Sequence, residues 1–311
     1  MSLLRQTLLW ASRSPTLARR LPRLGFVRRA VSRFMPGETL AEALAACQTL
    51  MGQGIGSVIT LLGENLADAS EARAVVDHYR GALDEIARRR LDAEVSVKLT
   101  HLGMELDPAA AAAGLAELAA RASGSGTVWV DMEGSATTAP TLELFRRVHA
   151  AHGNTGLCLQ AYLHRSAADL EALVAPGPGA ARIRLVKGAY AEPPAIAFAR
   201  KADVDASYLA LAERLLAAAH HDGPRPVFGT HDRPMIRRIV AQAEAGGLAK
   251  SAYEFHLLYG IQRDEQLRLA AAGHRVKVLI SYGSAWVPWY MRRLAERPAN
   301  LGFVLRNLFQ R

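Results

Sequence analysis

The segment at residues 182–190 reads RIRLVKGAY and places two cations in an otherwise apolar run. Its first half has the β-branched and aliphatic residues typical of a buried strand, and Lys187, Gly188 and Tyr190 follow where that strand must end. An unpaired charge taken out of water costs several kcal/mol, so Arg184 and Lys187 are expected to face an anion or a polar ligand. The alternative is that both side chains extend to solvent at the strand end.

Polar residues also follow the other apolar runs of the chain. The motifs are VKLTHLG, VDMEGS, LQAYLHR, FGTHD, YEFHLLYGI and ISYG. They contribute the candidate residues Lys98, Asp131, Glu133, Gln160, Thr230, His231, Asp232 and Tyr282. One such group alone is commonly a satisfied structural residue. Their repetition at successive strand ends indicates a shared functional edge.

The elements that carry these motifs alternate strictly between strand and helix. The expected strands are 57–61, 94–99, 127–132, 157–161, 182–186, 226–229, 252–255 and 276–280, after a first helix that begins near Leu40. The expected helices between and after them are 70–89, 108–121, 140–152, 167–173, 193–220, 234–245, 264–272 and 286–295. Eight βα units predict an α/β fold of the (βα)8 TIM-barrel type. An open doubly wound sheet is the alternative, but no GxGxxG motif supports it.

The composition is that of a globular protein in a reducing compartment. Half of the 311 residues are hydrophobic, and a barrel of this length forms one domain. No uncharged apolar run reaches the about 18 residues that would indicate a membrane span. Cys47 and Cys158 stand in no paired motif, which predicts buried core residues and no disulfide.

The net charge of +9 is concentrated in an N-terminal arm at residues 1–34. Eight of the 38 cations and none of the acids lie there, so the predicted catalytic domain at 35–311 carries 30 cations against 29 acids. Arginines interspersed with Leu, Trp and Phe predict an amphipathic segment that contacts an anionic membrane surface. A transit peptide remains an alternative. A nucleic-acid partner is disfavoured because the rest of the chain is balanced.

Two chemistries could use such a strand-end site. Burial could make Lys98 or Lys187 the Schiff-base nucleophile of an aldolase. Alternatively, the cations could bind an anionic cofactor and an acid substrate. Arg292 and Arg293, in MRRLAER, favour the second chemistry, because paired guanidinium groups suit a carboxylate. The histidines lack zinc-like spacing and no GxSxG is present, so no metal and no serine nucleophile are expected.

These motifs together with SYGSAWVPWYMRRLAERPANLGFVLRNL resemble the proline dehydrogenases in their short, monofunctional bacterial form. The resemblance runs from about Phe34 to the C-terminus. It implies a distorted (βα)8 barrel with N-terminal helices and noncovalently bound FAD. It further implies oxidation of L-proline to Δ1-pyrroline-5-carboxylate, the first step of proline catabolism to glutamate, with hydride transfer to flavin N5. The electrons are expected to pass to a membrane quinone. The basic arm adds the prediction of a cytoplasmic protein that lies peripherally at the inner membrane surface, where a quinone can reach the flavin.

The resemblance also implies roles for individual residues. Asp131 and Arg184 would act at the catalytic centre, with Asp131 paired to Lys98 or Arg184. The implied substrate-binding residues are Lys98, Tyr190, Leu258, Tyr282, Arg292 and Arg293. The implied cofactor-binding residues are Met132, Gln160, Arg184, Val186, Lys187, Gly188, Ala189, Thr230 and His231. A tyrosine at position 282 would favour proline over hydroxyproline by its bulk. His256 departs from the family's EFQxLYG pattern, in which this position is glutamine.

The cationic residues of the predicted site also suit this reaction on chemical grounds alone, independently of the family resemblance. Proline must lose hydride from the carbon beside its amine, and the amine must be neutral to react. A pocket with several cations disfavours the ammonium form of the substrate. It also favours a reduced anionic flavin.

Overall fold

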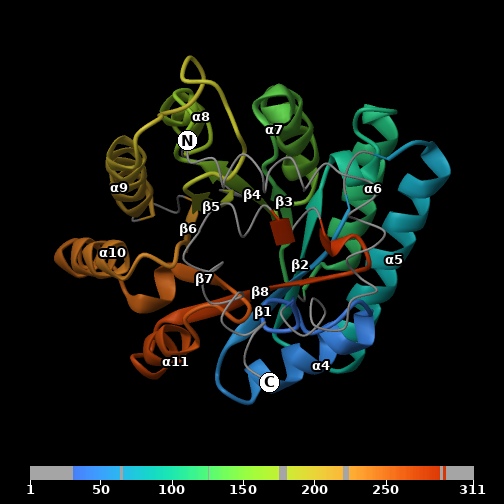
Figure 1. Ribbon diagram of the computed structural model, residues 1–311, viewed down its shortest axis with the longest axis horizontal. Coiled ribbons are helices and arrows are strands. Elements are labelled where there is room, and N and C mark those ends of the chain that lie inside the picture. The colour runs from blue at the N-terminus through green and yellow to red at the C-terminus, as the bar shows by residue number, and fades with distance from the viewer. Residues whose placement is uncertain are drawn as a thin grey trace, which may run out of the picture.

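Eight parallel strands close into a barrel in sequence order, with β8 hydrogen-bonded to β1. The computed structural model describes residues 31–63, 66–124, 126–174, 181–219, 224–287 and 290–291. Figure 1 shows the strands surrounded by helices. This arrangement confirms the predicted (βα)8 barrel and excludes the open sheet. Arg292, Arg293 and residues 1–30 of the predicted arm lie outside the described residues.

The strands agree closely with the predicted runs. They are β1 (Gly56–Leu61), β2 (Ala93–Lys98), β3 (Val128–Asp131), β4 (Thr155–Gln160), β5 (Arg182–Val186), β6 (Arg225–Gly229), β7 (Glu254–Leu258) and β8 (Arg275–Tyr282). Each strand except β7 begins and ends within two residues of its predicted bounds. The predicted run at 252–255 was placed too early, because a 3-10 turn at Lys250–Ala252 precedes the strand and the strand continues to Leu258.

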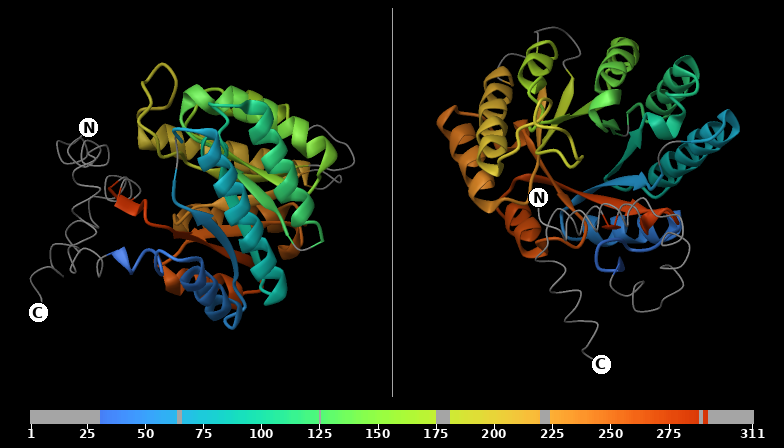
Figure 2. Two further views of the ribbon diagram at one scale, coloured as in Figure 1. Left: turned by 90° about the vertical axis from the view of Figure 1, so that its right-hand side faces the viewer. Right: turned by 45° about the horizontal axis from the view of Figure 1, so that its top comes forward.

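The helices form the outer layer of the barrel, as Figure 2 shows from two further directions. In the described ranges they are α4 (Leu40–Met51), α5 (Ala69–Arg88), α6 (Pro108–Arg121), α7 (Ser135–Ala151), α8 (Ser166–Glu171), α9 (Lys201–Ala218), α10 (Arg233–Ala245) and α11 (Arg263–Ala271). Side-chain caps determine where several helices begin. The Asp107 carboxylate accepts backbone N–H groups at the start of α6, and the Asp232 carboxylate accepts the Met235 N–H at the start of α10. Helix α9 begins eight residues later than predicted, because residues 193–200 form part of a loop.

Helix α4 precedes the barrel and covers β1 and β8. It supplies the predicted N-terminal helix, and its buried face includes Leu44 and Cys47. Cys47 and Cys158 are both buried and free, as predicted. Residues 31–34 lead into this helix through a turn, and Val31 is buried.

The alternation of side chains along each strand decides which residues reach the barrel interior. In β8, Val278 and Ile280 belong to the large core that packs beneath the helices. Leu279 instead joins Val58, Trp129 and Val227, which come from three other strands and meet inside the barrel. The inward positions of β8 are therefore the odd-numbered ones.

Tyr79 of α5 bridges β1 and β2 where the two strands separate. Their pairing ends at Ile59 and Val95. Beyond it, the Tyr79 hydroxyl accepts a hydrogen bond from the Leu61 N–H (2.9 Å) and donates one to the Ser96 carbonyl (2.9 Å). This buried hydroxyl thus replaces a missing part of the β-ladder.

The substitution Tyr79→Phe should lower the free energy of unfolding by about 1–3 kcal/mol, because it leaves two backbone groups unpaired. Urea unfolding would measure the change. Tyr253→Phe is the matched control: the Tyr253 hydroxyl is buried without a hydrogen-bond partner in the described chain, so its removal should not destabilise the protein. Equal effects of the two substitutions would contradict the bridging role.

Candidate functional site

Five strands end in inward-facing residues that meet at one mouth of the barrel. These residues are Lys98, Asp131, Gln160, Val186 and Leu258, which end β2, β3, β4, β5 and β7. Because the strands are parallel and the barrel is closed, their carboxyl ends share one rim. The structure therefore brings together residues that were predicted from separate motifs.

The centre of this rim is a buried ion pair between Arg184 and Asp131. The Arg184 Nη2 donates to Asp131 Oδ1 and to Ser96 Oγ, the latter at 2.8 Å. Ser96 Oγ in turn donates to Asp131 Oδ1 at 3.0 Å. This confirms that Asp131 is paired, as predicted, and that the partner is Arg184.

Arg184 stays charged in spite of its burial. Burial, the largest effect, disfavours the charged guanidinium, but the neighbouring groups Asp131, Cys158 and Glu94 together outweigh it and raise the pKa of Arg184 above its ordinary value. The Nη1 atom is buried and has no hydrogen-bond partner in the described part of the chain. The guanidinium thus keeps one buried nitrogen that no hydrogen bond of the described residues satisfies.

Several other strand-end groups hydrogen-bond to one another. Lys98 Nζ donates to the Gly63 carbonyl at 3.3 Å, in the loop after β1. Gln160 Nε2 donates to the Glu133 carbonyl at 2.7 Å, and the Glu133 carboxylate accepts from the Thr100 hydroxyl at 2.7 Å. Met132 is buried beside them. These contacts fix the loops that follow β1 to β4.

Lys187 differs from the inward-facing residues. Its Nζ lies 2.6 Å from Asp205 of α9 and 3.0 Å from Asp232 at the start of α10. The charge of Lys187 is therefore compensated within the protein, and its predicted contact with a cofactor stays a prediction. A Schiff-base lysine must be neutral, so two bound carboxylates also argue against Lys187 in that role.

The residues that follow β6 are held by local hydrogen bonds. The hydroxyl of Thr230 accepts from the Asp232 N–H at 3.1 Å, and the His231 Nε2 accepts from the Leu258 N–H at 3.1 Å. Thr230 is buried and His231 is half-buried at the mouth. Both lie at the predicted end of the barrel.

The loop after β5 is held in place by packing against Tyr162 and by hydrogen bonds to Ser135. Gly188 has a φ of +107°, and a side chain there would collide with Tyr162. Tyr190 packs against the cluster that Tyr162 forms with Leu163 and Ala197. Further along, Glu192 accepts from the Ser135 N–H (2.7 Å) and hydroxyl (2.6 Å).

This Glu192 contact places a carboxylate at the first turn of α7, where the helix dipole favours negative charge. It joins the loop after β5 to the loop after β3 and so fixes the segment that carries Ala189 and Tyr190. Sequence analysis did not identify Glu192, because a glutamate in a loop gives no local signal of its distant partner.

The predicted position of Tyr282 in the substrate pocket is wrong. Tyr282 belongs to the outward face of β8, is fully buried in the core beneath the helices, and hydrogen-bonds to His78 Nε2 of α5 at 2.8 Å. Its neighbour Leu279 faces inward and pairs in register with Leu258. The size of Tyr282 therefore cannot discriminate between proline and hydroxyproline by direct contact.

A second buried polar cluster lies at the amino ends of the strands. Glu94, Glu254 and His256 bring potential ligand atoms within 4.8 Å of one another. However, Lys277 lies 3.0 Å from Glu94, and Arg225 lies 2.9 Å from Glu254. Cations already neutralise both carboxylates, so this cluster is better described as an ion network than as a metal site.

This ion network borders a polar cavity of about 200 Å³ that Arg182 and Arg275 also line. Sequence analysis missed it, although the alternation of Glu94, Ser96 and Lys98 with valines in β2 was the signal of inward-facing polar residues. Polar residues at this end of a barrel serve stability.

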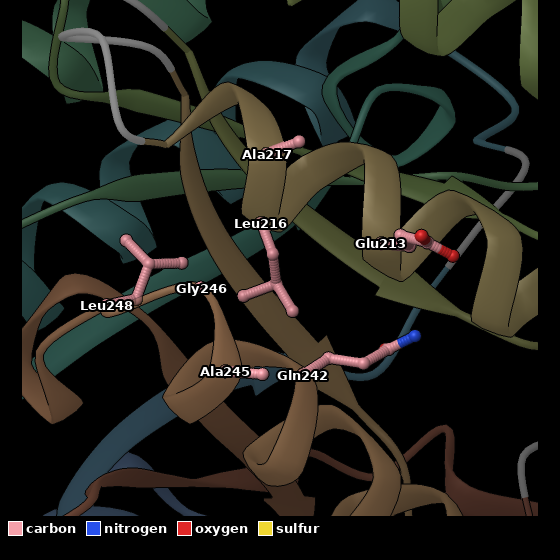
Figure 3. A pocket seen from close by; sticks show the side chains of 7 residues that line it. All are labelled: Glu213, Leu216, Ala217, Gln242, Ala245, Gly246 and Leu248. Carbon is pink, nitrogen blue, oxygen red and sulfur yellow. The ribbon is translucent and has the colours of Figure 1, made fainter.

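A separate hollow of about 670 Å³ lies between α9 and α10. Figure 3 shows the side chains that line it. Its lining includes Glu213, Leu216, Gln242 and Leu248. It lies in the outer helical layer, and none of the predicted site residues that the structure describes lines it.

Comparisons with known proteins agree on one family. A family model described as proline dehydrogenase matches residues 43–306. Proline dehydrogenase 1 of Bacillus subtilis strain 168 is 33% identical over 313 residues, which cover 99% of this chain and 100% of the relative. Proline dehydrogenase of Deinococcus radiodurans is 34% identical over 284 residues, or 89% of each chain.

Solved structures agree with the fold. Proline utilization A (PutA) from Bradyrhizobium japonicum, as the mutant D779Y, aligns with a TM-score of 0.73 at 26% identity and covers 94% of this chain. PutA from Bdellovibrio bacteriovorus, inactivated by N-propargylglycine, aligns with a TM-score of 0.81 at 23% identity over 99% of this chain. The alignments cover 34% and 37% of these two PutA chains, so this chain spans about a third of their length.

The buried His256 should make stability depend on pH. Burial lowers the pKa of His256 below its ordinary value of 6.5, against the opposing effect of Glu254 on the same strand, while Arg184 of β5 lowers it further and Glu94 of β2 raises it. As the pH falls below about 6.5, the unfolded chain takes up a proton that the native chain does not, so stability falls.

Replacing His256 removes this contribution. The stability of the wild type relative to His256→Gln should therefore be greatest near pH 7.5 and clearly smaller near pH 5.5. Urea unfolding at both pH values measures the difference. Tyr253→Phe is the control and should show the same difference at both pH values, because burial raises the pKa of the Tyr253 phenol to about 12. A constant gap for His256→Gln would contradict the burial of a neutral imidazole.

Proposed function

Because the chain belongs to the proline dehydrogenase family, and so is an oxidoreductase that acts on proline, we propose that it oxidises L-proline to Δ1-pyrroline-5-carboxylate with noncovalently bound FAD. This reaction is the first step of proline catabolism to glutamate. The observation that carries the proposal is the Arg184–Asp131 ion pair at the carboxyl ends of the strands. Active sites of (βα)8 enzymes are built at this end.

The residues at the mouth suit a flavin. Arg184 has a buried Nη1 donor with no partner in the described residues, and a heteroaromatic ring system with nitrogen and oxygen acceptors would satisfy it. Met132, Gln160, Val186, Gly188 and Ala189 would line the ring system, and Lys187, Thr230 and His231 would meet the rest of the cofactor. When bound, the flavin supplies the hydride acceptor, at N5.

The contribution of the chain to catalysis is orientation and charge. Arg184 stays cationic because Asp131 compensates its burial, and its guanidinium keeps one position because Ser96 and Asp131 both accept from it. Asp131 is thereby engaged and is not a free general base. A fixed cation beside the substrate amine favours the neutral amine, which is the form that can lose hydride.

The substrate would be held from several sides. Arg292 and Arg293, which lie outside the described residues, would bind the proline carboxylate as a paired donor set. Lys98 would assist them from the end of β2. Tyr190 and Leu258 would contact the pyrrolidine ring, and the Glu192–Ser135 contact would keep the Tyr190 loop in place.

Electrons would then pass to a membrane quinone. The arm at residues 1–34 carries eight arginines and no acids, and such a segment is attracted to anionic lipid. We place the protein in the cytoplasm and peripherally at the inner membrane surface on this ground. In the described residues no helix is both long and apolar enough to span a membrane.

A lysine Schiff-base aldolase, the other chemistry compatible with the sequence, loses its support. The matching family catalyses oxidation of proline, and the Lys187 ammonium is bound by two carboxylates. No observation on the described residues favours this alternative over the flavin enzyme.

An absorption spectrum tests the proposal. The purified protein should be yellow, and anaerobic addition of L-proline should bleach its flavin bands because the cofactor becomes reduced. D-Proline is the control and should leave the bands unchanged. A colourless protein that borohydride traps on a carbonyl substrate would overturn the proposal in favour of the aldolase.

Membrane contact is tested by deleting residues 1–30. The shortened enzyme should bind anionic vesicles at least tenfold more weakly, since roughly 1 kcal/mol is lost for each arginine near the surface. Vesicle sedimentation measures binding, and turnover with a soluble dye should be unchanged while quinone-linked turnover falls. Unchanged vesicle binding and quinone turnover would rule out this role of the arm.

A further inference from the structure

Trp129 lies in the middle of the barrel interior, directly against Arg184. The Arg184 Cζ is 4.8 Å from the centre of the Trp129 ring, and the guanidinium lies over the indole. The indole is 1% exposed. A cation over an aromatic face is attracted by the ring quadrupole, and the attraction is strongest where water is excluded.

The indole of Trp129 is itself fixed on three sides. Its Nε1–H donates to Glu94 Oε2 at 2.8 Å, which ties it to the ion network below. On the neighbouring strand, a side chain at Gly156 would come within 2.6 Å of the ring, so the ring packs directly on this backbone. The imidazole of His256 meets it edge-on, with ring centroids 5.3 Å apart.

Arg184 and His256 thus both contact the Trp129 indole. The guanidinium is charged, whereas the imidazole is neutral. His256 is neutral near pH 7 because burial lowers its pKa, and its Nε2 pairs with Glu254 at 3.0 Å. Because the imidazole is neutral, Arg184 is the cation of this pair that the indole quadrupole attracts. Trp129 can therefore serve as a rigid support for a single cation.

We propose that Trp129 is a positioning residue, which acts through Arg184: its fixed indole sets the orientation of the guanidinium that faces the cofactor and the substrate amine. The inference rests on the proposed function, since Arg184 is the group through which it acts. Asp131 and Ser96 fix one nitrogen of Arg184, and the indole fixes the plane of the whole group. The unpartnered Nη1 is thereby aimed in one direction.

The test compares three variants of the FAD-loaded enzyme. Trp129→Leu removes the aromatic face and should lower kcat about tenfold, the expected effect of a desolvated cation–π contact. The KM for proline should change less than twofold, because the carboxylate is bound elsewhere. Trp129→Phe retains an aromatic face and should keep kcat within about threefold of the wild type. Val58→Ala is the matched packing control, because Val58 belongs to the same interior cluster.

A second measurement does not depend on activity. The guanidinium resonances of Arg184, assigned with Arg184→Lys, should be shifted upfield by the indole ring current in the wild type and lose that shift in Trp129→Leu. If Trp129→Leu does not fold, the wild type and Trp129→Phe give the same comparison with a reduced shift. Unshifted Arg184 resonances in the wild type would overturn the proposal.

The kinetic outcomes are equally decisive. Equal losses of kcat in Trp129→Leu and Val58→Ala would show that Trp129 only fills space, and an unchanged kcat in Trp129→Leu would also reject positioning. If the wild type neither holds FAD nor oxidises proline, the proposed function fails, whereas the resonance shift still reports whether the indole holds Arg184.

Discussion

The structure depends on how the buried charge of Arg184 is compensated. A guanidinium that is 3% exposed would be strongly destabilising without partners. Asp131 supplies the opposite charge, Ser96 an additional acceptor and Trp129 a polarisable surface. These groups come from β2, β3 and β5, so compensation requires the strands to be in register. The ion pair thus links the fold to the geometry of its mouth.

Buried charged groups are paired differently at the two ends of the barrel. At the amino ends, Glu94 and Glu254 are each bound by cations of the barrel itself. At the carboxyl ends, Arg184 keeps a buried donor without a partner in the described residues. A closed ion network stabilises the scaffold, whereas an incompletely satisfied one leaves interaction energy for a ligand. The barrel interior therefore combines a stabilising ion network at the amino ends of the strands with a ligand-binding site at their carboxyl ends.

The sequence predicted the strands well because each is a short apolar run bounded by turn residues or a helix. The resemblance to the family implied that Asp131 is paired with Lys98 or Arg184, and the structure shows the pair with Arg184. The face of Tyr282 was not predictable from its motif: ISYG marks a strand end, but only the register of β8 shows that Leu279 and Ser281 face inward. A shift of one residue exchanges the two faces of a strand. The partner of Lys187 was equally hidden, because Asp205 lies 18 residues further along on a helix.

His256 shows how the departure from the family's glutamine fits the same interior. A neutral imidazole has one hydrogen-bond donor and one acceptor, as a glutamine amide also provides both. Burial keeps His256 neutral, so the exchange leaves the charge pattern around Arg184 unchanged. A charged imidazole would instead set two cations against one indole, with Glu254 as the nearest compensation. The barrel therefore accommodates histidine at this position as long as burial keeps the imidazole neutral.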